Sequence, residues 1–167
     1  RSGDLSQALS RFRSFVLRHH DSPLATEAYA YLGRIFILQN RYADALLYLE
    51  RIVEIERTAE VNLLVGYSLI MSGENEPGLA QLQPVANQTF SPADQQYLFE
   101  GMALAHDRLD EPLRSLYFYH QALPGSSNPQ ILLMTVHRIL EEKADSALLT
   151  EAAFMFSESP IGQDARL

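Results

Sequence analysis

The stretch that decides the fold runs from residue 26 to residue 56 and reads TEAYAYLGRIFILQNRYADALLYLERIVEIE. Its apolar side chains recur every three or four residues, which is the spacing of one face of an α-helix. The second half carries one such stripe, formed by Tyr42, Ala45, Leu46, Leu49, Ile52 and Val53. Residues 5–16 carry a second stripe, and no segment alternates polar and apolar residues as a half-buried strand does. The sequence therefore predicts an all-α protein.

Helix starts are marked at nearly regular intervals. Four serine or asparagine residues stand directly before a proline: Ser22, Ser91, Asn128 and Ser159. Such side chains cap the first turn of a helix, and proline suits the first helical position. Thr58 predicts a fifth start without a proline. The interval from Pro23 to Pro160 then divides into four repeats that average about 34 residues, which indicates a helical repeat protein.

Residues 26–56 resemble a tetratricopeptide repeat, a module of two antiparallel helices. Six residues match the pattern of that family: Tyr29, Leu32, Gly33 and Phe36 in the first helix, and Ala45 and Leu49 in the second. A weaker copy follows about 33 residues on, with matches at Gly66, Gly73, Gly78 and Leu82. A third copy places SLYFYHQAL in its second helix, after a loop two residues longer, and its first helix contains Tyr97 and Gly101.

This resemblance implies a right-handed α-solenoid of about four TPR-like helix pairs, whose units bury their apolar faces by stacking on one another. We expect a single domain over residues 1–167, truncated at both ends from a longer chain. Because a larger side chain would hold paired helices apart, three glycines are interpreted as close crossing points: Gly33, Gly66 and Gly101. Pro84 is expected to kink a helix. Residues 128–157 match the pattern poorly and are predicted helical from periodicity alone.

The first 33 residues resemble a narrower group of these repeats, found in bacterial envelope proteins. The matching residues are Gly3, Asp4, Ala8, Phe12, Phe15, Asp21, Ser22, Pro23, Glu27, Ala28, Leu32 and Gly33. The stretch SPIGQDARL at residues 159–167 repeats part of the pattern. The resemblance implies a periplasmic segment of a Gram-negative outer-membrane lipoprotein, linked to cell-wall synthesis or outer-membrane maintenance. Penicillin-binding-protein activators are the type it resembles, with Tol-Pal-associated and outer-membrane-assembly lipoproteins as relatives in style.

Charge and composition exclude several other classes. A formal net charge of −8 argues against nucleic acid as a partner, because lysine and arginine carry most of the affinity for phosphates. The chain has no cysteine, so disulfides and thiolate zinc sites are excluded. No apolar run reaches the roughly 20 residues of a membrane span, so a membrane is expected only through a lipid anchor outside this sequence. Residues 58–107 lack lysine and arginine, which indicates either a solvated acidic face or a site for basic partners.

The titratable residues do not form a recognisable catalytic or metal-binding pattern. His19 and His20 are adjacent, so their side chains diverge on a helix, and three other histidines are isolated: His106, His120 and His137. The acidic pairs Glu54/Glu56 and Glu141/Glu142 are interpreted as solvated helix faces. We therefore expect neither an enzyme nor a cofactor or metal.

The candidate site is the inner face of the helix array. In tetratricopeptide arrays the first helix of each pair lines the concave surface, and the resemblance carries that role to eleven residues: Glu27, Arg34, Ile37, Leu38, Leu63, Tyr67, Ile70, Met71, Leu98, Met102 and His106. Such a row suits an amphipathic helix or an extended peptide. Alternatively these side chains fill the interior of a tight superhelix or pack against a neighbouring domain. Tyr117, Phe118 and Tyr119 point around a helix, so one is expected to be exposed.

The leading functional hypothesis is a non-catalytic protein-protein interaction scaffold, whose partner is another protein, a peptide or an adjacent domain. One alternative is a cytoplasmic adaptor that captures a partner peptide. Another is an accessory arm of an enzyme whose catalytic domain lies outside this sequence.

Overall fold

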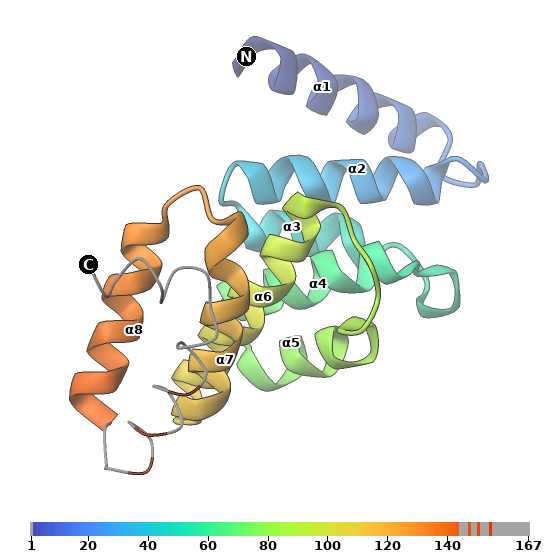
Figure 1. The fold of residues 1–167 in the computed structure, drawn as a ribbon. Coiled ribbons are helices and arrows are strands. Elements are labelled where there is room, and N and C mark those ends of the chain that lie inside the picture. Colours follow the sequence, from blue (N-terminus) through green and yellow to red (C-terminus); the bar gives the residue numbers. More distant parts are fainter. Residues whose placement is uncertain (1, 144–146, 148–149, 151–153, 155–167) are drawn as a thin grey trace. The chain divides into compact units, whose positions relative to one another are not determined.

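The computed structural model describes residues 2–143, 147, 150 and 154, and this part of the chain contains helices and no strand (Figure 1). Its eight α-helices are α1 Ser2–Arg18, α2 Ala25–Leu38, α3 Tyr42–Leu49, α4 Ala59–Met71, α5 Asn75–Leu82, α6 Pro92–Arg108, α7 Pro112–Ala122 and α8 Pro129–Lys143. Short 3-10 helices follow three of them, at Glu54–Glu56, Gln83–Val85 and Leu123–Gly125. The predicted all-α class is confirmed for these residues.

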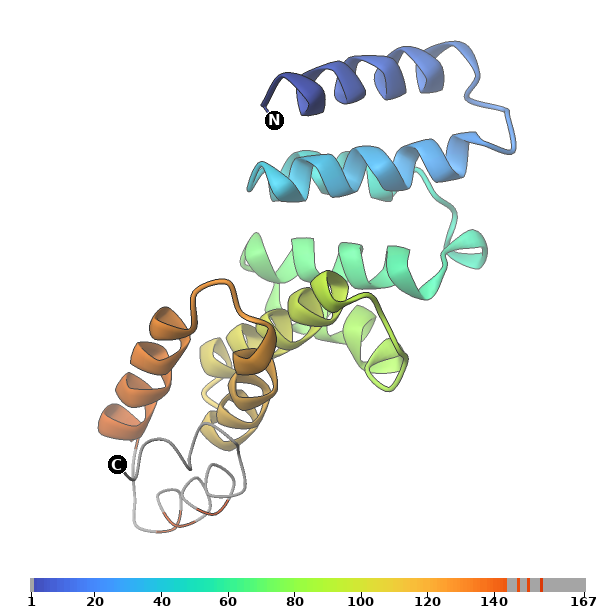
Figure 2. The same cartoon turned by 45° about the horizontal axis from the view of Figure 1, so that its top comes forward.

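Contacts group the chain into two compact units, residues 1–88 and residues 89–167. In the first unit, α2 packs against α1 and α3, and α4 packs against α3 and α5. Figure 2 shows α1, α2 and α4 side by side, in dark blue, light blue and green. In the second unit, α7 packs against α6 and α8. The expectation of a single domain over residues 1–167 stays a prediction.

Three of the predicted helix starts are found where the sequence places them. At the start of α4, the Thr58 hydroxyl accepts a hydrogen bond from the Val61 N–H at 3.3 Å. At the start of α6, the Ser91 hydroxyl accepts one from the Asp94 N–H at 3.2 Å. These bonds satisfy N–H groups that have no partner inside the helix. α8 begins at Pro129, as the Asn128-Pro129 pair predicts.

The start of α2 differs from the prediction. The helix begins at Ala25, two residues beyond Pro23. The Ala25 N–H bonds to the Ser22 carbonyl at 2.8 Å, and the Ser22 hydroxyl accepts a bond from the Leu24 N–H at 3.2 Å. A tighter turn of the 3-10 kind therefore precedes the helix. The start predicted at Ser159-Pro160 lies outside the described residues.

Pro84 ends a helix instead of kinking one. α5 stops at Leu82, and Pro84 is the middle residue of the 3-10 helix Gln83–Val85. Proline has no N–H to donate, and in a longer α5 its ring would meet the carbonyl of Ala80, four residues earlier. The chain avoids this clash by leaving the α-helical conformation first.

The turns inside three helix pairs share one geometry. Their central residues, Asn40, Gly73 and Asp110, have positive φ angles of 57°, 99° and 61°. In each turn the following N–H bonds to the carbonyl five residues earlier at 2.9 Å: Arg41 to Phe36, Glu74 to Leu69, and Glu111 to His106. This is the Schellman arrangement, in which a residue in the left-handed region ends the helix. The pairs α2/α3, α4/α5 and α6/α7 therefore repeat one local backbone motif.

Glycines lie at the helix crossings of the first unit, as the sequence predicts for Gly33 and Gly66. A Cβ added to Gly33 would stand 2.5 Å from the Leu49 Cδ2, and one added to Gly66 would stand 2.7 Å from the Leu82 Cδ2. The α4/α5 crossing is tighter, because a Cβ on Gly66 would also lie 2.9 Å from the Gly78 carbonyl oxygen. Gly78 packs directly against the Ile70 side chain. These distances leave no room for a larger residue without movement.

The third pair has a different register from the one expected. Gly33 and Gly66 each stand seven residues before the turn residue of their pair, and the residue in that place before Asp110 is Ala103. Gly101 is buried, but it does not occupy the equivalent position, and Phe99 takes the place expected for Tyr97. The third pair has more residues than the second pair because its first helix is longer, and not its loop: α6 has 17 residues and α4 has 13. One added turn preserves the apolar periodicity, so sequence spacing does not reveal it.

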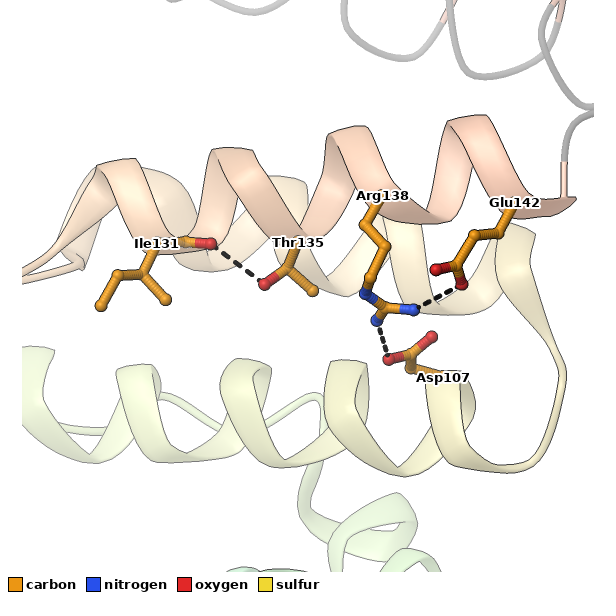
Figure 3. Close-up of polar contacts among 5 residues, drawn as sticks. All are labelled: Asp107, Ile131, Thr135, Arg138 and Glu142. Carbon is orange, nitrogen blue, oxygen red and sulfur yellow. Dashed lines mark hydrogen bonds and ion pairs between the residues drawn. The ribbon is translucent and has the colours of Figure 1, made fainter.

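Within the segment 128–157 that was predicted helical, α8 covers Pro129–Lys143, and nearly all of the remainder lies outside the described residues. The apolar face of α8, with Leu132, Val136 and Ile139, joins a core cluster that includes Leu116 and Tyr119 of α7. Figure 3 shows the polar contacts that Arg138 of α8 makes. The Arg138 guanidinium bonds to the Asp107 carboxylate of α6 at 2.7 Å and to Glu142 at 3.0 Å. These hydrogen bonds, the one to Asp107 above all, raise the pKa of Arg138.

Candidate interaction groove

The structure buries most of the predicted inner face. Seven of its eleven side chains are at most 6% exposed: Ile37, Leu63, Tyr67, Ile70, Leu98, Met102 and His106. Arg34 and Met71 are half-buried, and Glu27 and Leu38 are exposed. The buried members present little surface to a partner. Their burial fits the alternative hypothesis, in which these side chains pack inside the helix array.

Local contacts explain why some of these residues turn inward. Ile70 packs against Gly78 of its own helix pair. The ring of Tyr67 meets the ring of Tyr42 edge-on, with centroids 6.0 Å apart. The C-terminal halves of α2 and α4 therefore contribute to helix packing as much as to an open face.

In the second unit, the residues predicted for the inner face are affected by the register error of the third pair. Leu98, Met102 and His106 were placed by an alignment through Gly101. Aligned through the turn at Asp110 instead, the positions equivalent to Tyr67, Ile70 and Met71 are Leu104, Asp107 and Arg108. Of these only Arg108 is exposed.

An open groove does lie on the N-terminal halves of α2 and α4. It has a volume of about 520 Å³, and its lining includes Glu27, Tyr31, Arg34, Glu60 and Leu64. Glu27, Tyr31 and Arg34 are spaced by three and four residues, so they share one face of α2. Glu60 and Leu64 repeat the Glu27 and Tyr31 positions on α4. The groove thus combines two helices of the first unit that are not consecutive in sequence.

A second depression continues this groove toward α1. Its volume is about 430 Å³, and it is lined by Arg11, Phe12, Phe15, Leu24, Glu27, Ala28 and Tyr31. Glu27 and Tyr31 border both depressions, so we treat the two as one inner groove. Tyr31 is 46% exposed and stacks on Phe12 with ring centroids 5.2 Å apart, and Leu24 is 60% exposed. This end of the inner groove is therefore apolar and open to solvent.

The α2/α4 end of the inner groove is acidic. Three carboxylates line it, those of Glu27, Glu56 and Glu60, against the single guanidinium of Arg34. Glu56 also accepts a hydrogen bond from the Thr26 hydroxyl at 3.3 Å. An apolar floor beside an acidic rim is suited to a segment that carries both apolar and basic side chains.

The histidines take structural roles in the described part of the chain. His106 is 3% exposed, its Nδ1 lies 2.6 Å from Glu111 Oε2, and Phe118 stacks on its ring. The hydrogen bond with His106 is the main reason that the pKa of Glu111 is lowered. Burial lowers the pKa of His120. His20 pairs with Asp21 and His137 with Glu141 on exposed surfaces.

Among the described residues, no three histidine or carboxylate side chains come close enough together to hold a metal ion. Glu141 and Glu142 bind His137 and Arg138, and Glu54 and Glu56 lie on an exposed 3-10 helix. Of the three consecutive aromatic residues at 117–119, one was predicted to be exposed, and it is Tyr117.

Sequence reasoning missed most of the inner groove. Tyr31 and Leu64 were not selected, although each stands one helical turn beyond Glu27 or Glu60 and faces the same way. Extending the predicted face toward the helix N-termini would have found them. Phe12 and Leu24 had no such signal, because their place beside Tyr31 depends on how α1 packs against α2.

None of the described helices is both long enough and apolar enough to cross a lipid bilayer. No protein-family model matches the chain, and no significant match was found among curated proteins or solved structures.

Proposed function

We propose that this chain is a non-catalytic interaction module that holds a segment of a partner protein in the inner groove. The observation that carries the proposal is the groove itself, where exposed Tyr31 and Leu24 adjoin the carboxylates of Glu27 and Glu60. Exposed aromatic and aliphatic side chains in a concave site provide the apolar contact area on which peptide binding depends. The carboxylates favour a partner segment with lysine or arginine beside its apolar residues.

The repeat architecture is part of the same proposal. The helix pairs α2/α3, α4/α5 and α6/α7 share a Schellman turn, and in the first unit glycine lies at equivalent crossings. These features support TPR-like pairs stacked in a right-handed α-solenoid, which is how such units bury their apolar faces.

The setting we propose is the periplasmic face of the outer membrane, with the chain as the repeat segment of a lipoprotein. The support is the resemblance of residues 3–33 to repeats of bacterial envelope proteins. Mass spectrometry of the native protein from its own cells tests this. A diacylated or triacylated N-terminal cysteine is expected, whereas an unmodified methionine start would leave the cytoplasmic adaptor as the better hypothesis.

The groove is tested with three fluorescent peptides that share two leucines and differ only in the flanking residues, which are lysine, glutamine or glutamate. The lysine peptide is expected to bind most tightly. Replacing Leu24 and Tyr31 together by alanine should weaken its binding at least fivefold, because both side chains form the apolar end of the groove. Glu60→Gln should weaken the lysine peptide and not the glutamine peptide.

The matched control is Leu38→Ala. Leu38 is 56% exposed and lies on the same helix, but it does not line the inner groove. Circular dichroism checks that each variant remains folded. Equal binding by the Leu24/Tyr31 variant and the Leu38 variant would place the site elsewhere, and failure of all three peptides to bind would contradict the proposal.

A further inference from the structure

A second groove lies on the other side of α2. Its volume is about 760 Å³, and it runs between α1 and α3. Tyr29 is its only lining residue from α2, and at about 100° per residue this side chain points away from the face shared by Glu27, Tyr31 and Arg34. We call it the outer groove. None of the eleven residues predicted for the inner face lines the outer groove.

The walls of the outer groove expose apolar side chains. Leu17 on α1 is 81% exposed, and Leu47 on α3 is 64% exposed. Val16, Tyr29 and Tyr48 complete the apolar lining. Large aliphatic residues on facing helices, both open to solvent, provide contact area for an apolar side chain of a partner.

Arg13 is one of the residues that line this groove, and its neighbours hold it in place. Its Nε donates a hydrogen bond to the Tyr48 hydroxyl at 3.1 Å, and its guanidinium carbon lies 5.2 Å from the centre of the Phe36 ring. These contacts fix the plane of the guanidinium while using only one of its five N–H groups. Within the described residues, its two terminal nitrogens have no acceptor. Arg13 is therefore oriented before any ligand arrives, which lowers the entropic cost of binding.

Arg51 supplies a second positive charge at the end of α3. Its side chain is exposed, and no carboxylate among the described residues pairs with it. The one carboxylate in the lining, Asp44, is already bound by Arg41 at 2.6 Å. His20, the remaining basic residue of the lining, pairs with Asp21. The outer groove is thus locally positive on a chain whose net charge is −8.

We infer that the outer groove docks an acidic segment of a partner protein, with a carboxylate bound by Arg13 and Arg51 and an apolar side chain between Leu17 and Leu47. Guanidinium groups bind carboxylates through paired N–H donors, a geometry that lysine cannot reproduce. At physiological salt, charges further than about 8 Å away are largely screened. The two arginines therefore act on such a segment even though the rest of the chain would repel it.

The glutamate peptide of the matched set is the probe, used with the full chain. It is expected to bind more tightly than the glutamine peptide, and added salt should reduce the difference. Arg51→Gln should weaken its binding about fivefold to tenfold, which corresponds to roughly 1 to 1.4 kcal/mol. Leu47→Ser should weaken the glutamate and glutamine peptides alike. Both residues are exposed, so neither change threatens the fold.

Arg18→Gln is the control, because it alters the net charge equally but lies outside the groove lining. It should change binding less than twofold. Equal losses for Arg18→Gln and Arg51→Gln would show general charge attraction and overturn the inference. Equal binding of glutamate and glutamine peptides would also overturn it. So would a dimer, seen by sedimentation, that Leu47→Ser abolishes, because a second copy of this chain would then occupy the groove. The Leu24/Tyr31 variant should bind the glutamate peptide normally, which separates this result from the test of the inner groove.

Discussion

The pairs α4/α5 and α6/α7 share one turn geometry but have different residues where their helices cross. In α4/α5 the positions are Gly66, Gly78 and Leu82, and the two glycines bring the backbones into close approach. In α6/α7 the equivalent positions hold three other buried residues: Ala103, Ser115 and Tyr119. The second unit adds polar ties, from Glu111 to His106 and from Arg138 to Asp107.

The backbone motif therefore does not dictate which residues lie at the helix crossing. The Schellman turn sets the direction of the second helix, and the side chains then decide how the pair is filled. Close packing of glycine against aliphatic carbon tolerates no added atoms. A crossing that already holds Cβ atoms and a tyrosine is instead sensitive to ionisation and to the removal of polar groups.

The largest difference in stability between the pairs α4/α5 and α6/α7 is expected at alkaline pH. Burial raises the pKa of Tyr119 to about 12, with the nearby Asp107 carboxylate as the next contributor. A raised pKa stabilises the fold while the phenol is neutral, so this contribution is complete below pH 10 and is lost as the pH rises through about 12. The loss amounts to about 2 to 3 kcal/mol, from two pKa units at roughly 1.4 kcal/mol each.

Hydrogen exchange between pH 9 and pH 12 measures this, together with tyrosine absorbance. We expect α7 to lose its protection from hydrogen exchange at a lower pH than α5, whose equivalent residue is Leu82. The Tyr119→Phe variant should lose the difference. If it keeps the same pH dependence, Tyr119 is not the cause.

Gly78→Ala should destabilise the first unit by about 2 kcal/mol. The added methyl group would lie 2.8 Å from the Gly66 carbonyl oxygen and against the Ile70 side chain, and backbone cannot move aside as a flexible side chain can. Overpacking of this kind costs about 1 to 3 kcal/mol, partly offset by the better helix propensity of alanine. Urea unfolding followed by circular dichroism measures the change. Unaltered stability would mean that α4 and α5 do not approach so closely.

Ser115→Ala makes the matching change in the second unit and should have the opposite sign. Ser115 is fully buried, and its hydroxyl oxygen has no hydrogen-bond partner in the described structure. Alanine removes this unsatisfied group and favours helix, so a gain of about 0.5 to 1 kcal/mol is expected. The same unfolding assay applies. Destabilisation here would indicate that the hydroxyl is satisfied, for example by a buried water.

Arg138→Met should have the smallest effect, a loss of about 0.5 kcal/mol. The ion pairs that Arg138 makes with Asp107 and Glu142 are partly exposed, and such pairs contribute little. The difference between wild type and variant should shrink when salt is raised. Glu142→Gln, which leaves the Asp107 contact in place, should cost less. A loss well above 1 kcal/mol would show that this tie, and not the core cluster, holds α8 on its unit.

Much of the helical pattern was predictable because it is local. The stripe from Leu5 to Val16 becomes the buried side of α1, and Thr58 and Ser91 cap their helices as their spacing indicates. Gly33 and Gly66 were identifiable because they recur at equal distances from the turn. The third crossing was misplaced because an inserted helical turn leaves the periodicity unchanged. The kink predicted at Pro84 was wrong because the sequence did not reveal that α5 ends before this proline.

The candidate site was only partly predictable, since Glu27 and Arg34 line the inner groove while Ile37 and Ile70 are buried. Helical periodicity shows which residues share a face, but a face can meet solvent, its own partner helix or another pair. The sequence by itself determined the all-α class and the capped starts at Thr58 and Ser91, because these depend on neighbours within a few residues. Only the tertiary structure decided the two grooves of the first unit, because a groove exists where helices distant in sequence pack side by side.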